Sequence, residues 1–206
     1  MAGLREAQKQ MTRKLLLSTA LELFRTKGYA ATTVDDIAAA AGTTRVTFYA
    51  YFPSRSDLMR ALIGELNELL ERIASPTHGS TARDLVAVVA DGSRQAITRW
   101  LLDISSRWDT ARPYLNAAFE AAAADPELRG LVDAWIEEAI GDVEDGLDQA
   151  GRFTPESRHT RGVLAIAQLD HAARNWTRER WGTEREQLIE VLAESWVGLL
   201  GSGSEG

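Results

Sequence analysis

Side chains suited to contacting a nucleic acid gather between Thr44 and Thr47 of this 206-residue chain. An arginine guanidinium donates two parallel hydrogen bonds to guanine O6 and N7, and Arg45 is the candidate for that contact. Threonine hydroxyls donate to phosphates or base edges, and valine and threonine methyl groups pack against the methyl group of thymine. Thr44, Val46 and Thr47 offer these groups. The residue types therefore predict a segment that contacts DNA.

Four further residues are candidates for phosphate contacts around this segment. The hydroxyls of Tyr49 and Tyr51 are expected to reach phosphates beside the groove. Thr33 and Arg55 each lie at the start of a predicted helix, where backbone amides and the helix dipole favour a phosphate.

Neighbouring residues have roles other than DNA contact open to them: burial for the aromatic ones and simple solvation for the charged ones. Phe48 and Phe52 are expected in the core of a three-helix unit rather than at the DNA. Lys9, Arg13 and Lys14 either reach the DNA backbone or minor groove, or form an ordinary solvated face. The sequence leaves both roles open for these three cations.

Two short helices joined by a tight turn must position the candidate residues. Thr33 is the predicted N-cap of the first helix, whose first turn carries two aspartates at the positive end of the helix dipole. Gly42 stands where a chain leaving a helix needs a positive φ. Thr44 then caps a second helix over Arg45 to Tyr51. A short helix, a turn and a second short helix form the helix-turn-helix geometry that places one helix in the major groove.

The rest of the chain is also predicted to be helical, with no alternation typical of a sheet. A cluster of helix breakers at 75–80 marks the expected domain boundary. We expect an all-α fold with an N-terminal helix-turn-helix domain at 1–55, a bridging helix at 54–74, a helical domain at 75–201 and a flexible tail at 202–206. The other predicted helices cover residues 6–27, 81–107, 109–124, 126–149, 155–180 and 184–200.

Charge is divided unevenly along the chain. The net charge is −7, but residues 1–60 carry nine Lys or Arg against five Asp or Glu, a net of +4. Because phosphate affinity depends on the local field, a basic N-terminal segment on an acidic body is compatible with DNA binding. Chance fluctuation along an acidic chain is the alternative.

Composition excludes several other classes of protein. Cysteine is absent, and the three histidines (His78, His159 and His171) lack metal-ligand spacing, so no metal or cofactor is expected. There is neither an 18-residue apolar stretch nor a signal peptide, so we expect no membrane contact and a cytoplasmic protein.

The run Thr-Phe-Tyr-Ala-Tyr-Phe-Pro-Ser-Arg, placed after the Ala-Gly turn, closely resembles the N-terminal domain of the TetR family of transcriptional repressors. The match covers roughly residues 10–62, and it implies that Arg45 and Tyr49 lie on the DNA-facing side. Thr43 departs from the valine or isoleucine usual in the family, which predicts slightly looser packing without a change of fold. Val46 also departs, which is compatible with a different operator.

The resemblance also implies that the C-terminal domain is all-helical, dimerises and encloses an effector pocket. All six tryptophans follow residue 95, and tryptophan suits both cores and amphipathic cavities. Residues 111–136 resemble, more faintly, the ethionamide-resistance branch of the family, which implies a long, mostly apolar pocket. For any single tryptophan, ordinary core is the alternative, and for His171 the alternative is an interhelical hydrogen bond. The candidate pocket residues are Trp100, Trp108, Asn116, Phe119, Trp135, Gln168, His171, Asn175 and Trp176.

The last two helices are the candidates for a homodimer contact. Apolar residues recur there at helical spacing, and small residues allow helices to approach closely. A two-fold dimer would place two recognition helices in successive major grooves, which implies a pseudo-palindromic operator. The residues concerned are Leu188, Val191, Leu192, Ser195 and Leu199, with Ala165, Ala172 and Ala173.

These observations favour a ligand-responsive repressor that binds a double-stranded DNA operator and is released by a small, largely apolar or amphipathic effector. The alternative is an all-helical interaction module or adaptor without sequence-specific DNA binding. An all-helical enzyme has no support, because the sequence offers no thiol, no metal-ligand spacing and no glycine-rich phosphate loop.

Overall fold

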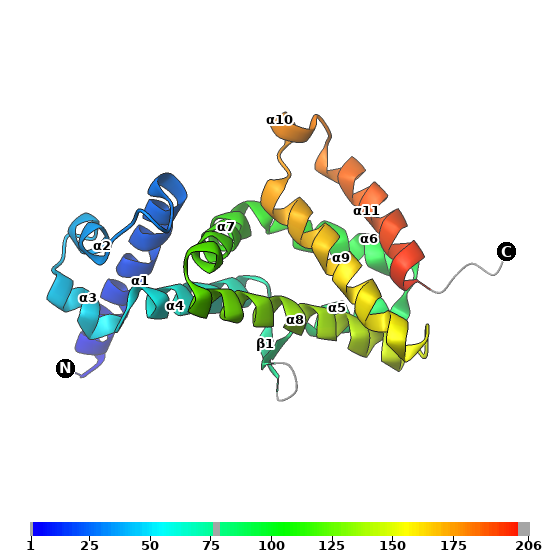
Figure 1. The fold of residues 1–206 in the computed structure, drawn as a ribbon, viewed down its shortest axis with the longest axis horizontal. Helices are drawn as coiled ribbons and strands as arrows, with labels where there is room; N and C mark the ends of the chain where they lie inside the picture. The colour runs from blue at the N-terminus through cyan, green and yellow to red at the C-terminus, as the bar shows by residue number, and fades with distance from the viewer. Residues whose placement is uncertain (1, 76–78, 202–206) are drawn as a thin grey trace. The chain divides into compact units, whose positions relative to one another are not determined.

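The computed structural model describes residues 2–75 and 79–201, and helices dominate them (Figure 1). The predicted all-α class is confirmed. In chain order the helices are α1 (Ala2–Lys27), α2 (Val34–Ala40), α3 (Arg45–Tyr51), α4 (Arg55–Leu69), α5 (Arg83–Asp91), α6 (Arg94–Ser106), α7 (Trp108–Ala124), α8 (Pro126–Gln149), α9 (Pro155–Asn175), α10 (Arg178–Trp181) and α11 (Arg185–Leu200). Two short strands, β1 (Ile73–Ser75) and β2 (Gly79–Thr81), lie between α4 and α5.

The chain divides into two compact units whose limits fall inside helices. One unit takes Met1–Leu66 and Pro113–Val132, and the other takes Asn67–Arg112 and Asp133–Gly206. The first unit therefore combines the helix-turn-helix segment with most of α7 and the start of α8. The division into a DNA-binding domain at 1–55 and an effector-binding domain at 75–201, joined by a bridging helix, stays a prediction.

The first unit is built on the apolar face of α1. Leu16, Ala20 and Phe24 are buried at the predicted helical spacing. Residues of α2, α3 and α4 complete this core, and each large side chain that is fully buried contributes about 1.5–3 kcal/mol. The first unit also buries Leu17, Ile37, Phe48, Phe52, Leu58, Met59 and Leu62.

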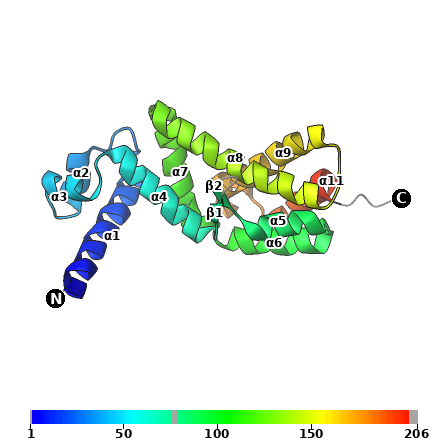
Figure 2. The ribbon, with the colours of Figure 1, turned by 90° about the horizontal axis from the view of Figure 1, so that it is seen from below.

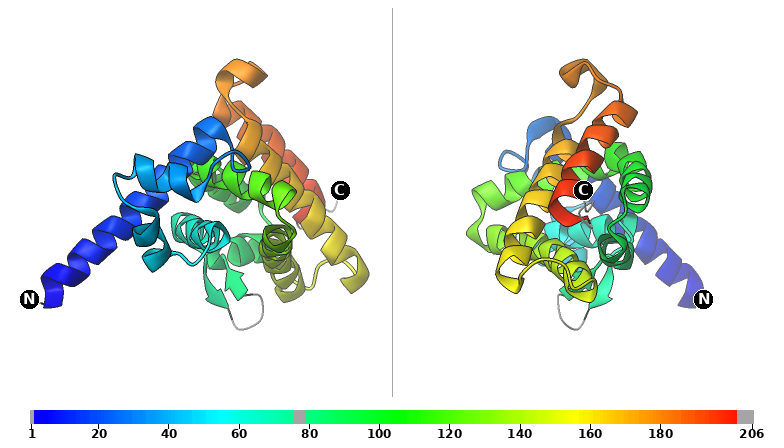
Figure 3. Two further views of the ribbon diagram at one scale, coloured as in Figure 1. Left: turned by 60° about the vertical axis from the view of Figure 1, so that its left-hand side comes forward. Right: turned by 90° about the vertical axis from the view of Figure 1, so that its right-hand side faces the viewer.

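The second unit packs α11 against α6 and α9, and α5 against α6 (Figure 2). Figure 3 shows α9 and α11 side by side. Gly146 on α8 allows a close crossing with α5, because a Cβ there would lie 2.7 Å from the carbonyl oxygen of Val86 and the Cβ of Val89. No helix within residues 2–75 and 79–201 has the length and apolarity that a membrane crossing requires.

The predicted helix at 54–74 is too long, and the prediction of no strand is wrong for the segment that follows it. α4 ends at Leu69, and Glu71 adopts φ 56°, which a helix cannot contain. The strands pair antiparallel in the register Ile73 with Thr81. Strands of three residues are too short to show an alternating pattern.

Two other predicted helices are interrupted. The helix predicted over 81–107 breaks at Gly92, where φ is 69°, and Ser93 caps α6 by accepting a hydrogen bond from the amide of Ala96. The helix predicted over 155–180 ends at Asn175, and Thr177 caps the short α10. The tail at 202–206 lies outside the described residues.

Candidate nucleic-acid interface and effector site

The start of α2 is fixed by a reciprocal capping arrangement. The Thr33 hydroxyl accepts a hydrogen bond from the Asp36 amide at 3.1 Å, and Asp36 accepts one from the Thr33 amide at 2.8 Å. Lys27 also donates to the Asp36 carboxylate at 2.7 Å, which with the Thr33 bonds holds the pKa of that carboxyl well below its usual range. The predicted N-cap is confirmed. The carboxylate thus ties the end of α1 to the start of α2.

The turn before α3 also has the predicted local geometry. Gly42 adopts φ 65°, which a residue with a side chain rarely does. The Thr44 hydroxyl accepts a hydrogen bond from the Thr47 amide at 3.1 Å, so Thr44 is the N-cap of α3 as predicted. The two hydroxyls lie 3.0 Å apart at the exposed start of this helix. A helix that faces DNA would present hydrogen-bond donors at this position.

Arg45 is exposed and bonded to two neighbours within the same unit. Its Nη1 donates to Asp35 on α2 at 3.1 Å, and its Nη2 donates to the Tyr49 hydroxyl at 3.4 Å. The guanidinium also lies over the Tyr49 ring, 5.5 Å from its centroid. The Tyr49 hydrogen bond and the Asp35 charge raise the pKa of Arg45, so the group is charged. These contacts orient the guanidinium along the outer face of α3.

The two faces of α3 differ sharply in burial. Val46 is 80% exposed and Tyr49 is 42% exposed, whereas Phe48 is 0% exposed and Phe52 is 3% exposed. The core role predicted for the two phenylalanines is therefore confirmed. Arg45, Val46 and Tyr49 share the solvent-facing side, which is compatible with a groove-facing surface.

The Arg55 side chain makes contacts within the protein that the sequence did not indicate. Its Nη1 donates to the carbonyl oxygens of Tyr29 at 3.0 Å and Thr32 at 2.5 Å, and its guanidinium lies over the Tyr29 ring at 4.1 Å. The side chain thereby holds the loop between α1 and α2. This makes Arg55 the weakest of the phosphate candidates.

The remaining basic and tyrosine candidates differ in exposure. Tyr51 is half-buried at the end of α3, and Lys9 and Lys14 are exposed on α1. The Arg13 guanidinium lies 5.3 Å from the centroid of the Phe52 ring. Arg13 therefore packs partly on the core of this unit, while the two lysines face solvent.

The predicted effector residues are split between the two units. Asn116 and Phe119 on α7 belong to the first unit, where the neighbouring Glu120 accepts a hydrogen bond from the Tyr29 amide at 3.1 Å. Asn116 is exposed and Phe119 is half-buried. The other candidates, from Trp100 to Trp176, belong to the second unit.

Two of the tryptophan pairs in the second unit form part of its core. Trp100 stacks on the fully buried Trp196 with ring centroids 5.5 Å apart. Trp108 is 2% exposed and meets Trp176 edge to face at 6.3 Å. Trp108 therefore has the core role that was the alternative to a place in the effector pocket.

Polar candidates in the second unit are bonded to neighbouring groups. Trp135 donates from Nε1 to Asn67 at 2.7 Å. Gln168 on α9 and Ser195 on α11 exchange hydrogen bonds of 2.9 and 3.1 Å.

His171 does not make the interhelical hydrogen bond considered from the sequence. Within the described residues its ring nitrogen contacts only the amide of Asn175 on the same helix, at 3.4 Å. Its ring is exposed and lies 5.9 Å from that of Trp181. The four-residue spacing of His171 and Asn175 in the sequence did not indicate that their side chains contact each other.

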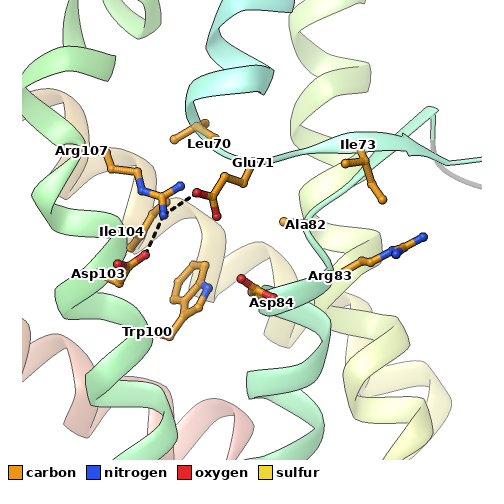
Figure 4. Close-up of a pocket in the computed structure, with 10 residues that line it drawn as sticks. All are labelled: Leu70, Glu71, Ile73, Ala82, Arg83, Asp84, Trp100, Asp103, Ile104 and Arg107. Carbon is orange, nitrogen blue, oxygen red and sulfur yellow. Dashed lines mark hydrogen bonds and ion pairs between the residues drawn. The ribbon is translucent and has the colours of Figure 1, made fainter.

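A cavity of about 240 Å³ lies within the second unit and involves only one predicted effector residue, Trp100. Figure 4 shows its charged walls, which include Glu71, Asp84, Asp103 and Arg107. The sequence did not single these residues out, because the turn after α4, the start of α5 and the end of α6 come together only in the fold.

Comparisons with known proteins agree on one family. The model of the bacterial regulatory proteins of the tetR family matches residues 16–62. The chain is 32% identical over 195 residues to the HTH-type transcriptional repressor LfrR of Mycolicibacterium smegmatis, which covers 91% of this chain and 89% of LfrR. It is 34% identical over 125 residues to the HTH-type transcriptional regulator EthR of the same species, covering 59% of this chain and 54% of EthR. The match to EthR thus spans about half of that relative, while the match to LfrR spans most of it.

Solved structures share the fold at lower identity. NalD, the secondary repressor of the MexAB-OprM multidrug efflux pump in Pseudomonas aeruginosa, aligns with a TM-score of 0.68 at 20% identity, over 95% of this chain and 98% of NalD. The TetR-family regulator PfmR from Thermus thermophilus aligns with a TM-score of 0.57 at 21% identity, over 91% of this chain and 98% of PfmR.

Proposed function

Because the chain belongs to the TetR family of bacterial transcriptional regulators, we propose that it is a dimeric repressor that a small effector releases from DNA. The observation that carries the proposal is the outer face of α3, which presents the exposed Arg45 and Val46 and the partly exposed Tyr49. The helix begins at the N-cap Thr44, whose hydroxyl accepts a hydrogen bond from the Thr47 amide. The named relatives are transcriptional regulators, not enzymes. A cytoplasmic location belongs to the same proposal.

Base contacts are assigned to the start of α3. Arg45 donates to guanine O6 and N7, and Val46 packs against a thymine methyl group. Thr44 and Thr47 donate to phosphates or base edges, and Tyr49 donates to a phosphate beside the groove. These assignments are supported by exposure and by the capped, rigid start of the helix.

Flanking contacts to the DNA backbone complete the proposed interface. Thr33 lies at the N-terminus of α2, and Tyr51 lies at the end of α3. Arg55 is the least favoured contributor because its guanidinium is bonded to loop carbonyls. The net charge of +4 over residues 1–60 supplies the attraction to phosphates that the acidic remainder of the chain opposes.

The dimer contact is assigned to the outward faces of α9 and α11. Leu164 on α9 is 48% exposed and Val191 on α11 is 61% exposed, and Val163, which precedes Leu164 in the sequence, is also exposed. By contrast, Leu192 and the predicted small residues Ala165, Ala172 and Ala173 are buried within the protomer, where they allow α9 and its neighbours to pack closely. A two-fold contact through this face would pair two recognition helices with half-sites about 34 Å apart.

Effector release requires only a difference in affinity between two states of the dimer. A small, largely apolar or amphipathic molecule that binds the DNA-free state more tightly shifts the population away from the operator, with a coupling of about 1–3 kcal/mol. The half-buried indole of Trp100, which lines a cavity in the second unit, supplies apolar area for such a molecule.

A direct test uses the full-length protein and the DNA that flanks its own gene. We expect a footprint with two-fold symmetry and an affinity that falls steeply as salt rises, because several phosphates per subunit are neutralised. Random duplex of equal length is the control. Equal affinity for both duplexes would favour the adaptor alternative over a sequence-specific repressor.

A further inference from the structure

The cavity beside Trp100 has a wall of mixed chemistry inside a single unit. It is lined by the turn after α4, by β1, by the first turn of α5 and by the C-terminal half of α6 (Figure 4). Its volume is about 240 Å³, which accommodates a small organic molecule. Leu70, Ile73 and Ile104 supply apolar wall, and the polar wall is almost entirely ionic.

Of the two arginines among the lining residues, Arg107 is already compensated. Arg107 forms ion pairs with Glu71 at 3.0 Å and Asp103 at 2.9 Å, and it also donates to the carbonyl oxygen of Leu69 at 3.3 Å. One guanidinium therefore faces two carboxylates, and this group carries a net charge of −1. An anion entering the cavity would meet that excess of carboxylate.

Asp84 adds a carboxylate on the opposite side. Its side chain points toward the cavity and Trp100, whereas the neighbouring Arg83 points away (Figure 4). Within residues 2–75 and 79–201, no hydrogen bond or ion pair engages the Asp84 carboxylate. The carboxylate is therefore available to a ligand.

Trp100 gives the cavity an aromatic surface, and a second tryptophan supports its ring. Its indole stacks on the buried Trp196, with an interplanar angle of 25°, and the ring is half-buried. A fixed indole beside an unpaired carboxylate is the combination that attracts an organic cation, through the ring quadrupole and direct charge attraction.

We propose that this cavity binds a small organic cation, with its ammonium group between Asp84 and the indole of Trp100 and its apolar part against Ile73 and Ile104. The effector of the proposed repressor would then carry a positive charge as well as an apolar body. Binding itself is independent of DNA, and only the release of DNA by such a cation rests on the proposed function.

Calorimetric titration of the full-length, DNA-free protein tests the proposal with three benzyl compounds of equal heavy-atom count. The probes are benzyltrimethylammonium, the neutral N-benzylacetamide and the anionic benzylsulfonate. We expect saturable binding of the cation, at least about tenfold tighter than that of either comparator. Comparable binding of the neutral or anionic probe, or no saturable binding of the cation, would overturn the proposal.

Two single variants locate the site. Asp84→Asn is expected to weaken benzyltrimethylammonium binding by about fivefold or more, because it removes the unpaired charge. Arg83→Gln, which alters the adjacent side chain that points away, is expected to retain or slightly tighten binding. Unchanged affinity in Asp84→Asn would overturn the assignment. Both substitutions are at exposed positions, so both variants should fold. A thermal melt checks this.

A parallel operator-binding assay separates this inference from the proposed function. Loss of cation affinity with intact operator binding counts against the cation site alone. Cation binding without any operator binding counts against the repressor and leaves the site in place.

Discussion

Arg45 is bonded to two neighbouring side chains, and in the proposed interface DNA must replace them. Its guanidinium bonds to Asp35 and Tyr49, and both side chains of the ion pair are more than half exposed. Exposed pairs of this kind are worth roughly 0–1 kcal/mol, so DNA can displace Asp35 at small cost. The same carboxylate nevertheless repels phosphate. Asp35 is thus placed to lower non-specific DNA affinity more than specific affinity.

Asp35→Asn should therefore tighten binding to random duplex by about two- to fivefold. Binding to operator should tighten by less, because the variant also loses the carboxylate that orients the Arg45 guanidinium along the outer face of α3. Fluorescence anisotropy with both duplexes at two salt concentrations measures the ratio. Glu22→Gln is the matched control, because Glu22 is an exposed carboxylate paired with an arginine on α1. An equal effect from the control would show that only net charge matters.

At the scale of the element, the cap of α2 makes stability depend on pH. The pKa of Asp36 is depressed in the folded protein by the Lys27 and Thr33 hydrogen bonds. A depressed carboxyl pKa contributes stability above the unfolded value, and that contribution is lost as pH falls toward the folded value.

Thermal melts between pH 7 and pH 3 should consequently show a steeper loss of stability for the wild type than for Asp36→Asn. The variant should already be less stable at pH 7, because a charged acceptor at the cap has been removed. Parallel curves for the two proteins would show that Asp36 has no role in the acid transition.

The hairpin after α4 packs on a buried cation, Arg72. Arg72 is almost wholly buried, with Glu138 and Asp142 each 3.5 Å away, and its Nε donates to the Ser80 hydroxyl at 3.0 Å. Burial lowers the pKa of Arg72, and the two carboxylates oppose that shift. The guanidinium thus links the hairpin to α8.

Arg72→Ala should destabilise the protein by about 3 kcal/mol or more, because two carboxylates lose the buried positive charge that faces them. Urea unfolding followed by circular dichroism measures the loss. Arg25→Ala removes an exposed arginine from an ion pair on α1 and should cost roughly 0–1 kcal/mol. A comparable cost for both variants would contradict the role given to Arg72.

Sequence patterns predicted the elements whose signals are local. The N-caps Thr33 and Thr44 and the bounds of α8 followed from residue types at fixed spacing. The hairpin was missed because its stability comes from Arg72 and α8, more than fifty residues further along the chain. The same reason applies to the cavity at Trp100, whose carboxylates come from the turn after α4 and from the separate helices α5 and α6.

At the scale of the whole molecule, the proposed repressor couples operator binding to dimerisation through α9 and α11. Val191→Arg places a charge in the most exposed apolar position of α11 and should convert the dimer to monomer, as measured by light scattering. Operator affinity should fall with it, because a single half-site contact remains. Leu102→Arg, an exposed apolar position on α6, is the control and should remain dimeric. A dimeric Val191→Arg protein would place the contact elsewhere.

The central claim is that the outer face of α3 reads DNA sequence. The decisive measurement is the ratio of operator to random-duplex affinity for the double variant Arg45→Ala with Tyr49→Phe. Loss of one bidentate arginine–guanine contact costs about 1–3 kcal/mol, so the ratio should fall by roughly five- to hundredfold while the protein stays folded and dimeric. An unchanged ratio would contradict the claim and move sequence recognition to another surface.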